Sequence, residues 1–306
     1  MTPVTISYQT TRKNPRIHWF FDSLRLQLSE FPDLVKRVIV VDFWHGTRPL
    51  PIPDDYPVEI KYVKSMPSVW QGEHRLTKED WFDACSARNT SICYCDTEWL
   101  AYVDDLSVLM PGWMGCVNDA VKGNYIALGT YEKVKHLIVD NGYAVSYEGY
   151  HGGKDSRRTL VLGKGVLTCN GDWMYGCSAA IPLEAALVVN GWPVDLTSGC
   201  GAEDYVMGIA MGNCGYHFKY DTRMLTLESE EGHHEEPSFR REDFGKSPND
   251  MSHAILATAR QSKYFPNSFG EGGIRALRER ILSGGEFPIP KSPDRHWFNK
   301  KLLSEL

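Results

Sequence analysis

Short apolar runs alternate in the first half of the chain with segments whose apolar residues recur at helical spacing. The runs occupy residues 4–8, 38–41 and 99–103, and the first helical segment lies between the first two, with Ile17, Phe20, Phe21, Leu24 and Leu28 on one side. A run that is apolar throughout is typical of a strand buried on both faces. Strand, helix and strand at this distance form a unit with parallel strands. The pattern therefore predicts an α/β fold in which helices flank a mixed, mostly parallel sheet.

The same patterns predict most of the remaining elements. Strands are expected at residues 58–63, 125–128, 217–220 and 224–227, and helices at residues 78–93, 113–121, 182–189, 251–265 and 274–282. Residues 131–158 resist assignment, and a polar segment of this length is either a lid or a plain surface loop. We expect one α/β domain over residues 1–245, followed by a C-terminal helical extension and tail over residues 246–306.

Composition and charge narrow the class of protein. The net charge of −6 creates no overall field that would attract nucleic acid, although it leaves room for a local basic groove. The eight cysteines include no CxxC pair with metal-finger spacing, which is typical of free thiols in a reducing compartment. No run approaches the roughly 20 apolar residues of a membrane span, and the N-terminus lacks the pattern of a signal peptide. We therefore expect a soluble, cytoplasmic protein.

Acidic residues end two of the predicted strands. Asp104 and Asp105 follow the run at residues 99–103, and Asp42 follows the run at residues 38–41. Ligands of parallel sheets bind at the carboxyl ends of the strands. Two adjacent carboxylates repel each other unless a positive charge compensates them, which favours a divalent cation shared with a diphosphate; an exposed acidic turn is the alternative. Asp42 suits a contact with a base or ribose, or it caps the following turn.

Three further segments carry candidate chemistry. Arg88 lies on a mostly apolar helix face, where a guanidinium binds a pyrophosphate, braces the acids or extends over the surface. Glu203 and Asp204 follow a glycine loop in the first turn of a helix, where acids either stabilise the helix dipole or serve as a catalytic base. The acidic segment after the last predicted strand contains His233 and His234, which are metal ligands or part of a solvated loop.

The order of these segments resembles the GT-A glycosyltransferases. ISYQTTRKNPR matches a first strand and a loop that contacts the nucleotide, and VIVVD matches a second strand whose final Asp meets the base. SARNTSICYCDTEWLAYVDD matches a helix with an Arg–Asn pair and the strand that carries the D-x-D-type acids. NGDWMYG and GCGAEDYVMG match a glycine–aromatic loop and a Glu–Asp pair. The similarity covers about residues 3–236, although two adjacent acids stand where many members have a variable residue between them.

The resemblance implies a donor site and a metal site. The residues expected to hold the base, ribose and diphosphate of a nucleotide sugar are Thr10, Arg12, Asp42, Arg88 and Asp104. A Mn²⁺ or Mg²⁺ ion would be coordinated by Asp105 together with His233 or His234. A metal of this kind acts as a Lewis acid that neutralises the charge of a departing diphosphate.

The resemblance also implies an acceptor site and a reaction. Gly171 and Trp173 would contact the acceptor, Asp204 would deprotonate its hydroxyl group, and Glu203 would orient it, because an alcohol needs a positioned base to become a nucleophile. The Glu–Asp segment is most similar to that of inverting members. The implied reaction is transfer of a sugar, with inversion, from a nucleoside-diphosphate sugar such as a UDP-sugar to a hydroxyl of a glycan or glycoconjugate.

Three other functions are compatible with the sequence. A glycosyltransferase that acts on modified bases of DNA would use the basic residues at 154–158, 240–241 and 275–280, and nucleic acid would then be the acceptor. A non-catalytic nucleotide-sugar-binding module would need no base. A nucleotidyltransferase with a related sheet would release pyrophosphate in place of a nucleoside diphosphate.

Overall fold

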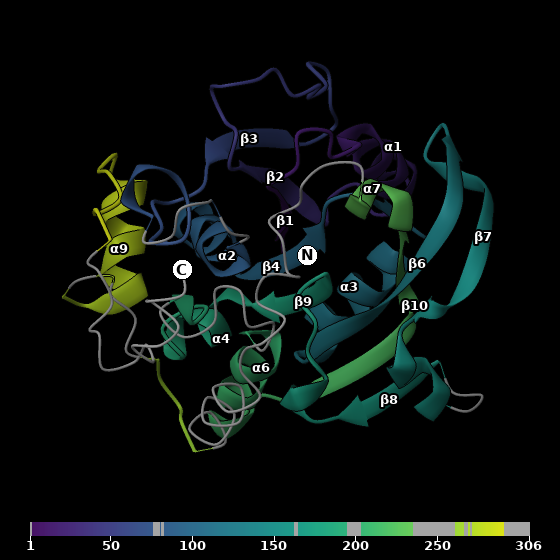
Figure 1. Cartoon of the computed structure of the whole chain (residues 1–306). Helices are drawn as coiled ribbons and strands as arrows, with labels where there is room; N and C mark the ends of the chain where they lie inside the picture. Colours follow the sequence, from purple (N-terminus) through teal and green to yellow (C-terminus); the bar gives the residue numbers. More distant parts are fainter. Residues whose placement is uncertain are drawn as a thin grey trace, which may run out of the picture.

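The computed structural model describes residues 2–75, 80, 83–161, 165–194, 203–234, 261–265, 269 and 271–290. Within these ranges the strands form one ten-stranded sheet (Figure 1). Eight strands lie side by side in the order β3 (Glu59–Lys64), β2 (Val35–Asp42), β1 (Val4–Thr10), β4 (Trp99–Asp104), β9 (Ser178–Pro182), β6 (Ile126–Asp140), β10 (Phe218–Ser229) and β5 (Ser107–Leu109). The other two, β7 (Tyr143–Lys154) and β8 (Val166–Cys169), pair with β6 and β10.

The two halves of the sheet differ in strand direction. β1 is parallel to both β2 and β4, and β2 is parallel to β3. β9 lies antiparallel between β4 and β6, whereas β10 is parallel to β6 and antiparallel to β5 and β8. The expected mixed sheet flanked by helices is confirmed. Because β1, β2 and β4 run in the same direction, their carboxyl ends meet at one edge.

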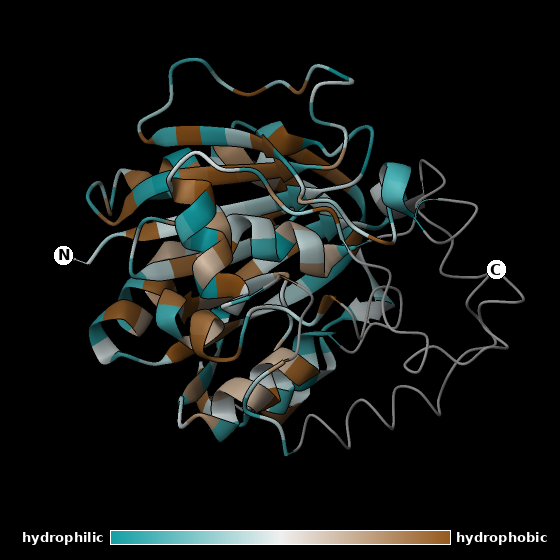
Figure 2. Ribbon diagram, turned by 90° about the vertical axis from the view of Figure 1, so that its left-hand side faces the viewer, coloured by the Kyte–Doolittle hydropathy of each residue, from teal (hydrophilic) through white to brown (hydrophobic). Residues whose placement is uncertain are grey.

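Helices cover both faces of the sheet (Figures 1 and 2). α1 (Ile17–Leu28) and α3 (Trp113–Gly123) pack on one face, and the other face is covered by α2 (Ala84–Tyr94), α4 (Leu183–Val188), α6 (Glu203–Asn213) and α9 (Gly273–Leu282). On β4, Leu100 and Tyr102 belong to the second layer's core, whereas Ala101 and Val103 belong to the first. Successive side chains of a strand point to opposite faces, so a strand covered on both sides is apolar throughout.

Shorter helical segments complete the described fold. Three 3-10 turns occur at Gly72–His74, Ser156–Leu160 and Gly171–Trp173, and α7 (Glu230–His234) follows β10 directly. Helix α2 begins later than the expected residue 78. Its N-cap is Asp83, whose carboxylate accepts from the backbone N–H of Ser86 at 3.0 Å. Residues 76–79 and 81–82 lie outside the described ranges.

Residues 131–158 are not the lid or surface loop that the sequence suggested. Most of them form the long hairpin of β6 and β7. Asn141 and Gly142 at its tip both have positive φ, 47° and 82°, which two-residue hairpin turns require. The Asn-Gly pair was therefore a usable hairpin signal. A side chain at position 142 would overlap the backbone of Asp22 in α1, so glycine also lets the tip pack against the body of the protein.

Two other details differ from the expected elements. The strand β9 over Ser178–Pro182 was not predicted, although the helix expected at residues 182–189 is observed as α4. The two strands expected at residues 217–220 and 224–227 are one strand, β10, with a register shift between Tyr220 and Leu225. A local irregularity of this kind interrupts the alternation of polar and apolar residues without ending the strand.

The C-terminal part packs on the main core as far as it is described. Ile274, Leu277 and Ile281 of α9 are buried in the same hydrophobic cluster as α2, α4 and α6. The helix expected over residues 251–265 falls almost entirely outside the described residues. Within those residues, every helix is too short or too polar to cross a bilayer.

Candidate active site

The acid pair Asp104–Asp105 lies at the carboxyl end of β4, beside the end of β1. The parallel register places Gln9 opposite Asp104. The side-chain amide of Gln9 donates to Asp104 Oδ1 at 2.6 Å, and the hydroxyl of Thr10 donates to Asp105 Oδ2 at 2.7 Å. Thr10, which was expected to contact the donor, therefore holds one of the acids in place.

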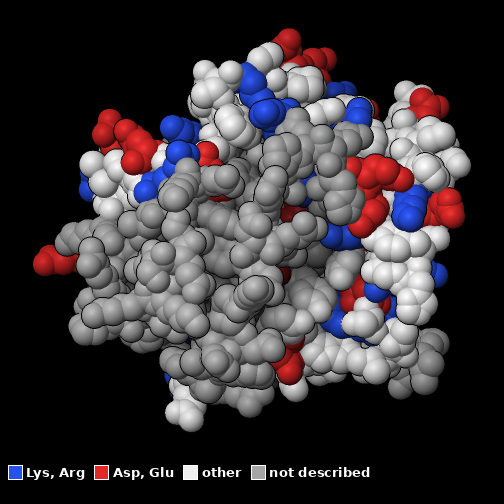
Figure 3. Space-filling view, viewed as in Figure 1, with Lys and Arg blue, Asp and Glu red and all other residues white. Residues whose placement is uncertain are grey.

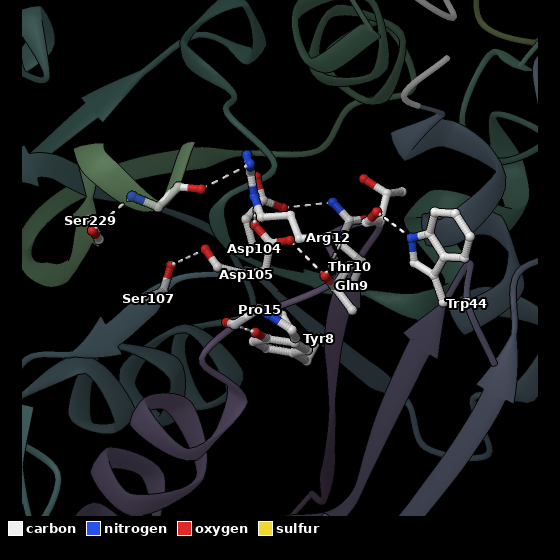
Figure 4. Close-up of polar contacts among 12 residues, drawn as sticks. Tyr8, Gln9, Thr10, Arg12, Pro15, Trp44, Asp104, Asp105, Ser107 and Ser229 are labelled. Carbon is white, nitrogen blue, oxygen red and sulfur yellow. Dashed lines mark hydrogen bonds and ion pairs between the residues drawn. The ribbon is translucent and has the colours of Figure 1, made fainter. Parts of the chain in front are cut away.

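Arg12 compensates the charge of Asp105. Its Nε donates to Asp105 Oδ1 at 3.0 Å, and its Nη1 donates to the backbone carbonyl of Gly232 in α7 at 3.3 Å (Figure 4). The loop after β1 thus links the acid pair to the helix that contains His233 and His234. The side chains of these two histidines lie outside the described residues.

The types of ligand atom expected at this site suit a divalent cation. A carboxylate and an imidazole are suitable ligands for Mn²⁺, and Arg12 joins Asp105 to the backbone of the histidine-bearing helix. Among the described side chains, no group of three His, Cys, Asp or Glu residues lies close enough together to hold a metal. Coordination by Asp105, His233 and His234 therefore stays a prediction, and a bound cation would compete with Arg12 for the same carboxylate.

Asp42, expected to meet a base or ribose, is fully buried at the end of β2. Its Oδ1 accepts from the backbone N–H of Trp44 and from Arg48 Nη2, both at 3.0 Å. Its Oδ2 accepts from the hydroxyl of Tyr62 at 2.7 Å. These bonds hold the following turn, as the capping alternative required. The contact with a nucleotide stays a prediction.

Arg88 joins the two acidic segments that are remote in sequence. Its Nη2 lies 3.5 Å from Asp104 Oδ1, and its Nη1 donates to Asp204 Oδ1 at 2.6 Å. The side chain is only 3% exposed, and its guanidinium lies 4.4 Å from the ring centre of Trp192. Burial alone lowers the pKa of Arg88, but Asp204 and Asp104 together raise it above the ordinary value. Of the three roles open to Arg88, bracing the acids is the one its contacts match; a diphosphate contact stays a prediction.

Asp204 lies with Glu203 in the first turn of α6. Burial raises the pKa of Asp204 above its ordinary value, while Arg88 and the backbone N–H of Gly176 oppose that rise. A carboxyl group with a raised pKa is a stronger base than an ordinary aspartate. The glycine loop expected before Glu203, residues 199–202, lies outside the described residues.

Replacing Gly176 with Ala is expected to lower the free energy of unfolding by about 1–3 kcal/mol, as overpacking of a buried site does. A Cβ at this position would overlap the guanidinium of Arg88 and push it away from Asp204. Urea unfolding measures the change. The matched control is Gly165→Ala, whose Cβ would meet only Arg223 at an ordinary 4.0 Å. Equal unfolding energies for both variants would contradict the predicted clash.

The glycine–aromatic loop packs closely on α6. At Gly171 a side chain would overlap the backbone of Gly208 in α6, so this glycine permits a helix contact. The ring of Trp173 makes an edge contact with Tyr220, with 5.5 Å between ring centres, and the Trp173 carbonyl accepts from Arg157. Acceptor contacts by Gly171 and Trp173 stay predictions.

Arg157, which is buried beside this loop, is a residue whose role no pattern in the sequence indicated. Its guanidinium makes a two-oxygen ion pair with Asp155, which is itself fully buried. It also lies 3.9 Å from the ring centre of Tyr175 and 4.8 Å from that of Tyr220. In the sequence, Arg157 stands among other polar and charged residues with no pattern that marks it as buried.

Cys177 lies where the acidic segments meet. Burial raises the pKa of its thiol well above the ordinary value, and Glu228, Asp104 and Asp204 all lie close enough to act on it. Glu228 comes from β10 and is buried, so a third acidic segment reaches the same region. Glu228 follows an expected strand, as Asp104 does, so its position in the sequence could have identified it as a candidate site residue.

Comparison with known proteins gives similar folds but no similar sequences. No family model matches the sequence, and no curated protein does. The crystal structure of GalNAc-T7 with UDP, GalNAc and Mn²⁺ superposes with a TM-score of 0.51 at 11% identity, covering 75% of this chain and 43% of the GalNAc-T7 chain. S. aureus TarS 1–349, in complex with UDP, superposes with a TM-score of 0.48 at 13% identity, covering 84% and 70% of the two chains. The chain thus spans less than half of the GalNAc-T7 chain, and the likeness bears on the fold, which is of the GT-A type.

Proposed function

We propose that the protein is a metal-dependent glycosyltransferase that transfers a sugar, with inversion, from a UDP-sugar to a hydroxyl group of a glycan or glycoconjugate. The observation that carries the proposal is the bridge by Arg88 between Asp104, in the donor-side acid pair, and Asp204, the candidate base. Two acids 100 positions apart are thereby held at one site. The likeness to GalNAc-T7, which was solved with UDP, GalNAc and Mn²⁺, supports the same reading.

The proposed reaction assigns one task to each acidic segment. Asp204 accepts the proton of the acceptor hydroxyl while the acceptor oxygen forms a bond to the anomeric carbon of the sugar. The bond from that carbon to the diphosphate breaks, and the nucleoside diphosphate leaves with the electron pair. Glu203 orients the acceptor. Attack from the face opposite the leaving group inverts the anomeric centre, so the base and the diphosphate lie on opposite sides of the sugar.

On the donor side, Thr10 and Arg12 hold Asp105, and Gln9 and Arg88 hold Asp104. Prepositioned side chains need not reorganise during the reaction, which favours catalysis. A divalent cation held by Asp105 and by His233 or His234 would supply Lewis-acid neutralisation of the diphosphate.

Incubation with UDP-sugars tests the proposal. A donor present at about 100 times its dissociation constant is expected to add about 2.7 kcal/mol to the free energy of unfolding, because it binds only the folded protein. Thermal unfolding with a panel of nucleotide sugars and Mn²⁺ measures this effect. Product analysis follows with the stabilising donor: release of UDP is expected, whereas release of pyrophosphate would identify a nucleotidyltransferase, and binding without any product would identify a binding module.

Removal of divalent cations is expected to abolish transfer, and added Mn²⁺ or Mg²⁺ to restore it. The reason is that the leaving diphosphate has a high negative charge that Arg12, already paired with Asp105, does not neutralise. Transfer rates are measured after dialysis against a chelator and again after addition of the metal. Full activity in the presence of chelator would contradict metal binding by Asp105, His233 and His234.

The described surface does not favour DNA as the acceptor. Of the basic residues at 154–158, Arg157 is buried against Asp155, and Arg158 pairs with Glu132 at 2.7 Å. Arg275 pairs with Glu184, whereas residues 240–241 lie outside the described residues. On the face in Figure 3, basic and acidic side chains are intermingled among the residues drawn in colour. Nucleic-acid binding calls for a continuous basic surface, so a hydroxyl of a glycan is the better-supported acceptor.

A further inference from the structure

Three tyrosines, Tyr131, Tyr175 and Tyr205, form what we call the tyrosine cluster. The ring centre of Tyr175 lies 5.9 Å from that of Tyr131 and 5.6 Å from that of Tyr205, and both pairs are edge-to-face. The hydroxyl oxygens of Tyr175 and Tyr205 are 2.8 Å apart. All three residues are partly exposed, so the cluster presents aromatic surface to the solvent.

The tyrosine cluster adjoins the candidate base. Tyr205 follows Asp204 in the first turn of α6, and Tyr175 precedes Gly176, whose backbone N–H donates to Asp204. Adjacent residues of a helix point in different directions, so chain adjacency alone does not bring the rings to the carboxylate. The link in space is Cys177, whose thiol lies within electrostatic range of both Tyr131 and Asp204. The tyrosine cluster and the candidate base therefore border the same buried thiol.

Buried groups hold the tyrosine cluster in place. Arg157 lies 3.9 Å from the ring centre of Tyr175 and also donates to the backbone carbonyls of Gly129 and Trp173. Asp155, fully buried, fixes Arg157 through both carboxylate oxygens. Because these contacts already hold the ring of Tyr175 in place, the ring is preorganised and loses little conformational freedom when a ligand binds.

The surroundings of the tyrosine cluster suit an uncharged ligand. Burial raises the pKa of Tyr131 to about 12 and that of Tyr175 well above its ordinary value, so both hydroxyls stay protonated. The nearby guanidinium groups that the structure describes are already paired with carboxylates: Arg88 with Asp104 and Asp204, Arg157 with Asp155, and Arg158 with Glu132. Among the described residues, an anionic ligand would therefore meet carboxylates and guanidinium groups that are already paired.

We propose that the tyrosine cluster is the acceptor subsite and that it binds an uncharged pyranose ring. The apolar C–H face of a pyranose packs on aromatic rings, while its hydroxyls exchange hydrogen bonds with tyrosine hydroxyls. The inference rests on the proposed function and adds to it the class of acceptor: a neutral sugar whose attacking hydroxyl is directed at Asp204. Tyr175 and Tyr205 then contact the acceptor in place of Trp173, to which the resemblance assigned that contact.

The test uses p-nitrophenyl pyranosides as acceptors, with the UDP-sugar that the wild-type protein accepts. Neutral probes, the p-nitrophenyl glucosides, galactosides and N-acetylglucosaminides, are compared with the negatively charged p-nitrophenyl glucuronide. For the neutral probe that is used best, Tyr175→Ala and Tyr205→Ala are each expected to raise the acceptor KM by about tenfold, which is the loss of one aromatic contact. The matched control, Tyr143→Ala, removes an exposed tyrosine at the tip of the β6–β7 hairpin and is expected to leave the acceptor KM unchanged.

Stabilisation by the UDP-sugar in thermal unfolding verifies that each variant is folded. If an Ala variant does not fold, Tyr175→Phe and Tyr205→Phe take its place. These variants keep the ring but remove a hydroxyl contact, and a rise in acceptor KM of roughly 2–10-fold is expected. An unchanged acceptor KM in these variants would overturn the inference.

The outcomes separate this inference from the proposed function. A wild-type protein that releases no UDP from any donor would refute the function and the subsite together. If the wild-type protein transfers sugar, a preference for neutral probes together with the raised KM supports the subsite. Transfer with unchanged KM in the variants, or a preference for the glucuronide, would leave the function standing and overturn the neutral-sugar subsite.

Discussion

Replacing Asp204 with Asn is expected to lower kcat for sugar transfer by about 10²–10⁴, the usual contribution of a general base. The amide keeps the shape of the carboxylate, but it cannot accept the proton of the acceptor hydroxyl. Donor binding is expected to persist, because the donor-side residues Asp104 and Asp105 keep their contacts with Gln9, Thr10 and Arg12. Steady-state transfer kinetics measure the first effect, and thermal stabilisation by the UDP-sugar measures the second.

The control for this variant is Asp119→Asn, which changes a half-exposed carboxylate of α3 that pairs with Arg223. It is expected to transfer sugar at the wild-type rate. Turnover of Asp204→Asn at the wild-type rate would eliminate Asp204 as the base.

The pH dependence of kcat for the wild-type protein is a second test of Asp204 as the base. Burial raises the pKa of this carboxyl group, and only its ionised form accepts a proton. As the pH falls through the raised pKa, the fraction of ionised base falls, so kcat declines at a higher pH than an ordinary aspartate would produce. Asp204→Asn is expected to remove this acid limb from the remaining activity.

Replacing Arg88 with Met is expected to lower the free energy of unfolding by about 3–5 kcal/mol, the cost of removing one member of a buried ion pair. The side chain of Arg88 is 3% exposed, and its removal leaves Asp104 and Asp204 without their shared cation. Urea unfolding at neutral pH measures the loss. Transfer is expected to fall as well, because without Arg88 the pKa of Asp204 rises further and its carboxylate loses its anchor.

Two comparisons make the Arg88 prediction specific. Arg275→Met removes an exposed ion pair with Glu184 and is expected to cost only about 0–1 kcal/mol. The double variant Arg88→Met with Asp204→Asn is expected to be less destabilised than the sum of the single variants, because removing both charges leaves less charge unpaired. Additive losses would mean that Arg88 and Asp204 stabilise the protein independently.

Much of the donor side follows from local sequence patterns. The apolar run at residues 99–103 identified β4, which is apolar throughout because its alternating side chains pack on two covered faces of the sheet. The acids Asp104 and Asp105 at its end then fell at the carboxyl edge of the sheet, where β1 also ends. The end of a strand can be recognised from the local sequence, and the carboxyl ends of parallel strands lie at one edge of the sheet. The positions of these acids could therefore be inferred without coordinates.

Other features depended on contacts that local patterns do not encode. The sequence did not indicate that the guanidinium of Arg12, in the loop after β1, pairs with Asp105 at 3.0 Å, and its expected contact with the nucleotide stays a prediction. The sequence did not predict the β6–β7 hairpin. Much of β7 and the outer part of β6 are exposed to solvent, so these strands lack a continuous apolar pattern. Arg157 belongs to the same class, because nothing beside it in the sequence indicates that Asp155 and two tyrosines enclose it.

The sequence by itself determined the strands and helices that have a clear hydrophobic periodicity, such as β1, α1, β2 and β4, and it placed acidic residues at strand ends and in a helix's first turn, because hydrophobic periodicity and helix-end chemistry are local. Only the tertiary structure decided which charges meet. Arg88, Asp104 and Asp204 come from α2, β4 and α6, and their pairing follows from how those elements pack. Electrostatic attraction depends on distance in space and on exclusion of water, and neither can be read from separation along the chain.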